Sequence, residues 1–186
     1  MNNLIAIGIP DTLLDANHTT VDAERWAEAM AILKAGKGIY LHGDAGRGKS
    51  FLAAAILRNL IDRAGNTGLL NNCIRFQGTS ELICEIRATF AGKAAETDID
   101  IIDRYSSYDM LVLDDLGVNK PSEFVVQTFD MIIDFRYKTQ RTKKTIITSN
   151  LSLDELSAKY DDRIASRIAG MCEVLKIGGE DRRMRR

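Results

Sequence analysis

The octapeptide at 43–50, GDAGRGKS, contains the residues whose types and spacing predict the clearest chemistry. It fits the pattern G-x-x-x-x-G-K-[ST] and lies between an apolar run at 38–42 and a helix-like run at 51–57. Glycines let backbone N–H groups turn towards phosphate oxygens, and a following helix adds the positive end of its dipole. Lys49 would reach the outer phosphates, and the Ser50 hydroxyl would bind Mg²⁺. This context favours a phosphate-binding loop over a flexible glycine turn, and so predicts a bound nucleoside triphosphate.

A second run, MLVLDD at 110–115, ends in two acids. Its uninterrupted apolar stretch is typical of a strand that is buried on both faces of a parallel sheet. At the carboxyl edge of that sheet, Asp114 could hold Mg²⁺ directly or through water, and Asp115 could act as general base towards the attacking water. Strands often end in acidic turns, so the run gains its meaning from the phosphate loop and from the alternation of strands and helices.

A third strand-like run, TIITSN at 145–150, would bring Asn150 beside the terminal phosphate. There its amide could orient water or sense the loss of the phosphate. Asn150 and Ser152 also suit a helix N-cap before Leu153, and the two roles are compatible.

Two arginines, Arg163 and Arg167, are four residues apart and would share one face of a helix. The rigid, permanently charged guanidinium suits phosphate, and an arginine supplied to a phosphoryl-transfer site accelerates the reaction by about 10³ to 10⁵. The alternative is a pair of local salt bridges to Asp161 or Asp162.

The elements that would position these residues alternate along the chain. Strands are expected at 38–42, 73–77, 110–114, 145–149 and 173–177, and helices at 23–33, 51–64, 80–90, 122–139 and within 153–170. Thr20 would cap the first helix, Gly36 would end it, and Thr79 would cap the helix at 80–90. The lead-in at 1–17 is expected to be irregular or strand-like, and 91–107 to be polar and exposed with a short helix. This order specifies a parallel α/β sheet.

Bulk composition is that of an ordinary globular chain: 186 residues, 45% hydrophobic and 27% charged, which favours one domain. The formal net charge of −1 means that any nucleic-acid contact must come from a local patch, and RRMRR at 182–186 is either such a patch or a solvated tail.

Three separated cysteines (Cys73, Cys84 and Cys172) are expected to be buried apolar residues in a reducing compartment. Because no apolar segment is long enough to span a bilayer and the start lacks a charged signal region, a cytoplasmic location is expected.

Together these elements resemble the AAA+ ATPase module, specifically the clade of DnaC/DnaI helicase loaders and the IstB transposition helper. The resemblance runs from about Gly36 to the end of the chain and includes GRGKSFLAAAI, LVLDDLGV, TIITSNL, DDRIASRI and GEDRRMR. It implies a P-loop NTPase fold with a five-stranded parallel sheet of order 5-1-4-3-2, flanked by helices and without a C-terminal helical lid. It also implies an AAA+ domain at 36–186, against which a lead-in and helix at 1–35 would pack.

The resemblance assigns roles to individual residues and implies ATP and Mg²⁺ as cofactors. The nucleotide would contact Gly43, Asp44, Ala45, Gly46, Arg47, Gly48, Lys49, Ser50, Phe51 and, after the last strand, Arg183. Ser50 and Asp114 would hold the metal. Asp114 and Asp115 match Walker B, and Asn150 matches sensor 1. Arg167 would be the finger that acts on a neighbouring subunit, with Arg163 beside it.

Members of this clade hold single-stranded DNA in the pore of a spiral assembly with an extra helix after the second strand. Arg87 and Phe90 match DNA-contacting positions, and Ser122 and Phe124 match a second contact loop. A cation for phosphate and an aromatic face for a base are suitable chemistry. The ordinary alternative is that the two phenylalanines are core or interface residues.

The implied function is an ATP-dependent helicase loader that self-assembles and helps to place a hexameric, DnaB-type replicative helicase. Loaders carry a separate N-terminal region that grips the helicase, whereas about 35 residues precede the first expected strand here. The chain would then be trimmed or a minimal version. The alternatives are an IstB-like transposition ATPase that binds duplex DNA, and a nucleotide-dependent switch that seldom hydrolyses ATP.

Overall fold

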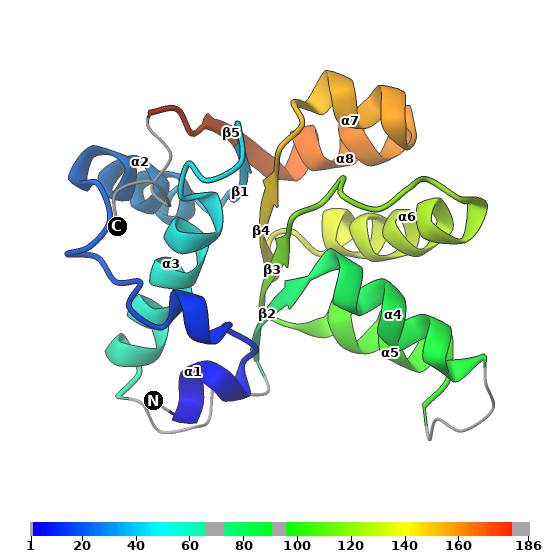
Figure 1. Cartoon of the computed structure of the whole chain (residues 1–186), viewed down its shortest axis with the longest axis horizontal. Coiled ribbons are helices and arrows are strands. Elements are labelled where there is room, and N and C mark those ends of the chain that lie inside the picture. Colours follow the sequence, from blue (N-terminus) through cyan, green and yellow to red (C-terminus); the bar gives the residue numbers. More distant parts are fainter. Residues whose placement is uncertain (1, 66–72, 91–95, 180–186) are drawn as a thin grey trace.

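The computed structural model describes residues 2–65, 73–90 and 96–179 and contains one parallel sheet of five strands (Figure 1). The strands are β1 (Gly38–His42), β2 (Ile74–Gly78), β3 (Met110–Asp114), β4 (Lys144–Ser149) and β5 (Cys172–Lys176). Their order is β2-β3-β4-β1-β5, and every neighbouring pair is parallel. The predicted order is confirmed. All carboxyl ends therefore lie at one edge, which is where ligands bind in open α/β sheets.

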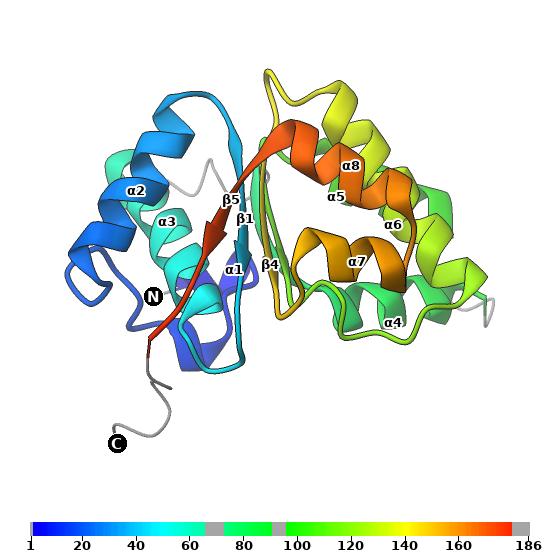
Figure 2. The same cartoon turned by 90° about the horizontal axis from the view of Figure 1, so that it is seen from above.

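Helices cover both faces of this sheet (Figure 2). One layer contains α1 (Asn2–Ala6), the 3-10 helix η1 (Asp11–Leu13), α2 (Ala23–Lys34) and α3 (Lys49–Arg63). The other contains α4 (Thr79–Thr89), α5 (Asp98–Ser107), α6 (Glu123–Lys138), α7 (Leu153–Lys159) and α8 (Asp162–Met171). Within the described part of the chain, no helix combines the length and the apolarity that a bilayer span requires.

The strand side chains alternate between two cores. Ile39 and Leu41 pack in the core beneath α2 and α3, whereas Tyr40 packs in the core beneath α4 to α8. In β3, Val112 lies opposite Phe76 of β2 and Ile146 of β4. Since both faces of β3 are covered, its run is apolar without alternation up to Asp114, as the sequence predicted for 110–114.

The lead-in before α2 was predicted to be irregular or strand-like; its described residues form two short helices, α1 and η1, joined by irregular segments, and no strand. It is linked to β2 by the Phe76 N–H, which donates to the Ile7 carbonyl at 2.8 Å, and by the Arg75 side chain, which donates to the Ala6 carbonyl at 3.3 Å. Gly8 follows with a φ of 91°, and a Cβ there would lie 2.3 Å from the Phe76 carbonyl oxygen. Glycine is needed at this close, left-handed approach, which brings η1 towards the carboxyl edge.

The cap of α2 is Asp22, which accepts from the Arg25 N–H at 3.1 Å. Thr20, the predicted cap, instead donates its hydroxyl to the Asp15 carbonyl at 3.1 Å. Asn17 causes this difference, because its side-chain oxygen accepts from the backbone N–H groups of Thr19 and Thr20 and so forms a turn before the helix.

Helix α5 corrects the expectation that 91–107 is exposed, for the part that is described. A capping box between Thr97 and Asp100 starts the helix, and Ile101, Ile102 and Tyr105 are buried along one side of it. Three apolar residues at helical spacing are enough to bury one face of an otherwise polar segment. Residues 91–95 of this expectation lie outside the described residues.

Cysteine burial also differs from the prediction. Cys172 is buried, Cys73 is half-buried and Cys84 is exposed on α4. The inner face of α4 is already filled by Leu82 and Ile86, so Cys84 lies on the opposite side of the helix.

Candidate nucleotide-binding site

The loop between β1 and α3 has the backbone that its glycines predict. Gly43, Gly46 and Gly48 have φ values of 142°, 77° and 91°. At Gly43 a Cβ would lie 2.3 Å from the Ile177 carbonyl oxygen, so the loop starts in close contact with the residue that follows β5. Gly48 is the N-cap of α3 and makes no side-chain cap, which leaves the first N–H groups of the helix facing the loop.

A cavity of about 810 Å³ opens beside this loop, within the size range of small-molecule sites. Its wall is formed by Thr12, Leu13, Ala45, Gly46, Gly48, Lys49, Ser50, Phe51, Asp115 and Asn150. Six of the predicted nucleotide contacts therefore line one cavity, together with residues from the ends of β3 and β4. Thr12 and Leu13 of η1 were not singled out in the sequence, because nothing local to them signals a ligand.

Lys49 lies at the centre of the loop with only 4% of its surface exposed. Its Nζ donates to the carbonyls of Gly43 and Asp44 and to Oδ1 of Asn150, each at 2.8 Å. Asn150 therefore reaches the phosphate loop, as predicted for a residue that would stand beside the terminal phosphate. The remaining loop residues form a separate contact, since Arg47 pairs with Asp44 at 3.3 Å and donates to the Gly179 carbonyl.

Asp114 and Ser50, the two predicted metal ligands, are brought together. Burial raises the pKa of the Asp114 carboxyl group, and hydrogen bonds from Thr148 and Ser50 act in the opposite direction. The Thr148 hydroxyl donates to Oδ1 of Asp114 at 2.7 Å. A hydroxyl and a carboxylate are the hard oxygen ligands that Mg²⁺ takes alongside phosphates and water, so the residues present fit an ATP·Mg²⁺ complex.

Asp115 has an unusual backbone that fixes its position. Its φ is 57°, a left-handed value that is uncommon outside glycine and best tolerated by Asp and Asn. Its N–H donates to the Thr148 hydroxyl at 2.9 Å, and its carbonyl accepts from the Thr79 hydroxyl at 2.9 Å. Two side chains from β4 and α4 thus hold the turn, while the Asp115 side chain stays exposed at the cavity.

Thr79 and Thr148 are contacts that the sequence interpretation missed. Thr79 was expected to cap the following helix, but Gly78 is the N-cap of α4, and the Thr79 hydroxyl is used across the fold. The available signal was a threonine placed directly after β2 and another near the end of β4, where a hydroxyl can reach the end of β3, the strand between them.

The two candidate finger residues on α8 differ in their contacts. The Arg163 side chain is 70% exposed, and its Nε lies 3.4 Å from Asp161, as the salt-bridge alternative proposed. The Arg167 side chain is 25% exposed and pairs with Asp130 at 2.5 Å and Asp134 at 2.8 Å. The acids that pair with Arg167 come from α6 instead of the local sequence. Neither arginine lines the cavity of its own subunit, and Arg183 lies outside the described residues.

Three of the four predicted DNA contacts meet on the surface, at the junction of α4 and α6. Phe90 is 63% exposed, and its ring meets the edge of the Phe124 ring at 5.4 Å between centroids. The Arg87 guanidinium lies 5.7 Å from the Phe124 centroid. We call Arg87, Phe90 and Phe124 the α4–α6 cluster. Ser122 caps α6 by accepting from the Val125 N–H at 3.4 Å.

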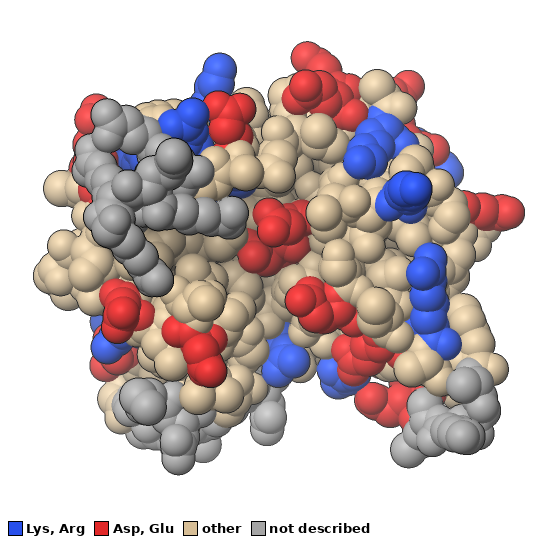
Figure 3. Space-filling view, in the orientation of Figure 1, with Lys and Arg blue, Asp and Glu red and all other residues tan. Residues whose placement is uncertain are grey.

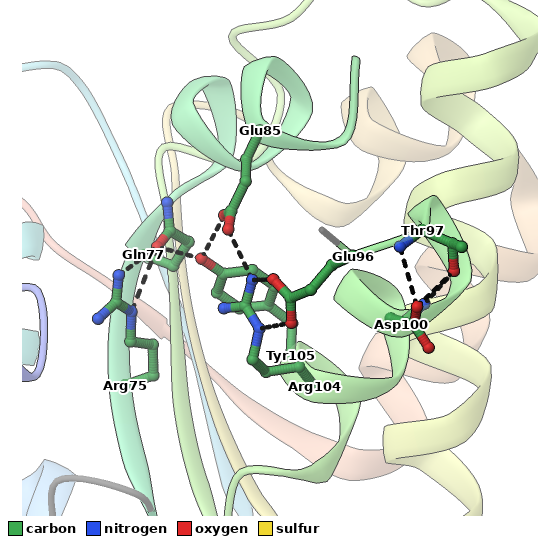
Figure 4. Close-up of polar contacts among 8 residues, drawn as sticks. All are labelled: Arg75, Gln77, Glu85, Glu96, Thr97, Asp100, Arg104 and Tyr105. Carbon is green, nitrogen blue, oxygen red and sulfur yellow. Dashed lines mark hydrogen bonds and ion pairs between the residues drawn. The ribbon is translucent and has the colours of Figure 1, made fainter. Parts of the chain in front are cut away.

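A polar network fixes α4 on α5 and β2 (Figure 4). Arg104 of α5 pairs with Glu85 of α4 at 2.6 Å and with Glu96 at 3.1 Å. The Tyr105 hydroxyl lies 2.7 Å from Glu85 and 2.8 Å from Gln77 of β2. Burial, followed by the contact with Glu85, raises the pKa of Tyr105 to about 12, so the hydroxyl keeps its proton and remains a donor.

Comparison with known proteins decides the family. Residues 17–186 match the family model described as IstB-like ATP binding protein. The chain belongs to this family. Its predicted place in the clade of DnaC/DnaI helicase loaders and IstB-like ATPases is confirmed, and so is its AAA+ P-loop fold.

Individual relatives agree with this placement. The replicative helicase loader DnaC of Buchnera aphidicola subsp. Acyrthosiphon pisum (strain APS) is 27% identical over 126 residues, which are 68% of this chain and 48% of that protein. The replicative helicase loader DnaI of Bacillus subtilis (strain 168) is 24% identical over 161 residues, 80% of this chain and 48% of that protein. The chain thus spans about half the length of the curated relatives it matches. A crystal structure of the DnaC helicase loader superposes with a TM-score of 0.75 at 25% identity, covering 91% of this chain and 100% of that one.

Proposed function

We propose that this chain is an AAA+ ATPase subunit that binds ATP·Mg²⁺ and single-stranded DNA, assembles with copies of itself and helps to load a DnaB-type replicative helicase. The observation that carries the ATPase part is the convergence of Lys49, Ser50, Asp115 and Asn150 on one phosphate-loop cavity, with Asp114 hydrogen-bonded to Ser50 beside it. The helicase part rests on the relatives and the similar structure, which are named as helicase loaders.

Each of these residues has a distinct task in hydrolysis. ATP·Mg²⁺ would supply the phosphoryl group and the charge of the metal. Lys49, already buried in the loop, offers its N–H donors to phosphate oxygens, and Ser50 with Asp114 offers oxygen ligands to the metal. Asp115 accepts a proton from water, since its side chain is exposed at the cavity. Asn150 accepts a hydrogen bond from Lys49 and would orient water beside the terminal phosphate.

Assembly completes the site. Arg163 and Arg167 lie on α8, outside the cavity of their own subunit, which is where an arginine that serves a neighbouring subunit must lie. Arg167 is proposed as the finger and Arg163 as its neighbour. Because the positive charge comes from another protomer, hydrolysis per subunit rises with protein concentration.

A pair of variants tests the division of roles. Lys49→Ala lowers ATP affinity by at least about tenfold, because it removes the charge at the phosphates. Asp115→Asn keeps ATP affinity and lowers hydrolysis by about a hundredfold or more, because the general base is lost. A fluorescent ATP analogue reports binding, and phosphate release reports hydrolysis. Equal loss of ATP affinity in both variants contradicts the assignment.

The partner is tested with the Asp115→Asn protein, which holds ATP without turnover. It is incubated with ATP, a purified DnaB-type helicase, and single-stranded or duplex DNA of one sequence. A complex with the helicase and a preference for single strands support loading. A preference for duplex DNA without helicase binding supports the transposition ATPase, which the IstB-like family model favours as the second candidate. Retention of ATP by the unmodified protein with DNA present, without phosphate release, indicates a nucleotide switch.

A further inference from the structure

Arg167 is held by two carboxylates that belong to its own subunit. Its two terminal nitrogens are divided between them: Nη1 lies 2.5 Å from Asp130 and Nη2 lies 2.8 Å from Asp134. The two aspartates are one turn apart on α6, so they present their oxygens side by side to α8. The guanidinium therefore already makes the forked contact that it would make with a phosphate.

The two aspartates differ in whether another cation stays beside them when their contact with Arg167 opens. Asp134 has a second cation, since its Oδ2 lies 2.5 Å from Nζ of Lys138. Contact with Lys138 is also the largest cause of the lowered pKa of Asp134, ahead of Arg167. Asp130 has no other ion-pair partner among the described residues. Opening the Arg167–Asp134 contact therefore leaves no uncompensated charge, whereas opening the Arg167–Asp130 contact leaves one.

The weakness and the partial exposure of the Arg167 ion pairs also favour an exchange of partners. The side chains of Arg167, Asp130 and Asp134 are each about one quarter exposed, so water can reach them and an exchange of partners is open to a group at the surface. Partly exposed ion pairs are weak, and a phosphate carries more negative charge than a carboxylate. The donor on Nη2 can thus be given up to a phosphate at small cost, while Nη1 stays bonded.

We propose that Asp130 is a positioning residue that keeps Arg167 on α6 in the free and the assembled subunit, and that Asp134 occupies the second guanidinium donor only until a nucleotide phosphate of a neighbouring subunit replaces it. This inference rests on the proposed function, because it takes Arg167 as the group that reaches the neighbour. It adds a consequence: neighbouring aspartates on one helix have opposite effects. Removing Asp134 favours assembly, and removing Asp130 impairs the finger.

The variants Asp134→Asn, Asp130→Asn and Lys138→Met separate these roles in the full chain. Assembly is followed by sedimentation velocity with ATP·Mg²⁺ and with ADP, and turnover is measured at saturating protein. With ATP, Asp134→Asn lowers the concentration for half-assembly by about threefold and leaves kcat unchanged, because a competing partly exposed pair is lost. Lys138→Met raises that concentration by about threefold, since Asp134 then depends on Arg167 alone. The double variant Asp134→Asn/Lys138→Met has the same half-assembly concentration as Asp134→Asn.

Asp130→Asn lowers kcat by about tenfold at saturating protein, because the finger loses the bond that orients it. With ADP, which has no terminal phosphate, the three variants assemble like the unmodified protein. Thermal unfolding is recorded for all variants. If the two aspartates were purely structural, Asp130→Asn and Asp134→Asn would lower stability equally and would not have opposite effects on function. A loss of kcat or of assembly with ATP in Asp134→Asn, like the loss of function in Asp130→Asn, overturns the inference. Unchanged hydrolysis in Arg167→Ala would instead remove the finger assignment on which it rests.

Discussion

Asp114 is the residue at which function and stability conflict most directly. Its carboxyl group is buried at the end of β3, and burial raises its pKa against the hydrogen bonds of Thr148 and Ser50. A group with a raised pKa in the folded state favours folding below its unfolded-state pKa. That contribution is lost as the pH rises through the folded-state pKa. Ionisation of Asp114 therefore opposes folding of the nucleotide-free protein as the pH rises, as expected of a group kept for a cation.

Asp114→Asn consequently stabilises the nucleotide-free protein at neutral pH while it weakens Mg²⁺-dependent ATP binding. The expected gain is about 1 kcal/mol, or a rise in Tm of about 2 to 4 °C for a chain of this size. The gain disappears below about pH 4, where the carboxyl group is protonated in both states. Thermal unfolding at pH 3.5 and pH 7.5 measures it. Asp115→Asn is the matched control, because that side chain is exposed and asparagine tolerates its left-handed φ. An equal rise in both variants contradicts this account of Asp114.

The sequence identified the candidate residues whose roles can be recognised from their neighbours in the chain. Lys49, Ser50 and Asp114 each follow or precede a recognisable strand, so their convergence follows from the parallel sheet alone. Thr148 and the Asp130 contact with Arg167 depend on how strands and helices meet after folding. No spacing in the chain relates Arg167 to Asp130, and a threonine near a strand end signals a hydroxyl there without indicating its partner.

At the scale of elements, the lead-in shows how a backbone contact can position part of the cavity. Gly8 approaches the edge strand β2, and η1 then brings Thr12 and Leu13 to the cavity wall. Arg58 of α3 donates to the Leu14 carbonyl at 2.7 Å and holds the end of this segment. The lead-in therefore links the sheet edge to the nucleotide site.

Gly8→Ala and Gly36→Ala test this link as a matched pair. Both glycines have a left-handed φ, 91° and 78°, but a Cβ at Gly36 has nothing within 4 Å, whereas one at Gly8 meets the Phe76 carbonyl. Gly36→Ala is expected to cost about 1 kcal/mol of unfolding free energy from backbone strain alone. Gly8→Ala costs about 1 to 3 kcal/mol more, from the clash, and also weakens ATP binding by moving η1. Chemical denaturation and nucleotide titration measure the two effects. Similar costs for the two variants contradict the role of the close approach.

Element types and order could be predicted because each strand and most helices carry their own pattern of apolar residues. The failures have tertiary causes. Asn17 forms a turn that moves the cap of α2 to Asp22, and α5 is buried because Ile101 and Tyr105 meet α4 and α6. Arg136 shows a role that the sequence could not predict. It is fully buried on α6 and donates to Thr145 and to backbone carbonyls, which its position in the chain does not indicate.

At the scale of the whole molecule, neither the net charge nor the drawn face of the described residues marks a nucleic-acid surface, and the basic run at 182–186 lies outside the described residues. The chain carries a formal net charge of −1. On the face drawn in Figure 3, Lys and Arg side chains form small separate groups, and acidic side chains occupy the centre between the two helical layers. A broad basic surface would give strong, salt-dependent binding to any nucleic acid. Under the proposed function, DNA binding through this face must therefore depend on a few contacts in each subunit, repeated by assembly.

If the α4–α6 cluster supplies such contacts, Phe90→Ala is expected to weaken single-stranded DNA binding by about tenfold, since stacking of one base on an aromatic ring contributes about 1 to 3 kcal/mol. Arg87→Ala should weaken binding and reduce the slope of affinity against salt by about one phosphate contact. Fluorescence anisotropy with a labelled oligonucleotide, at three salt concentrations and with ATP·Mg²⁺, measures both.

Ile99→Ala is the control, because Ile99 is an exposed apolar residue of α5 outside the cluster. Thermal unfolding separates the two interpretations of Phe90. A base-stacking residue that is 63% exposed leaves Tm nearly unchanged when truncated, whereas a core aromatic lowers it by several degrees. Lost stability with unchanged DNA affinity would place Phe90 and Phe124 in the packing between α4 and α6, and the DNA surface would have to be sought elsewhere on the assembled subunits.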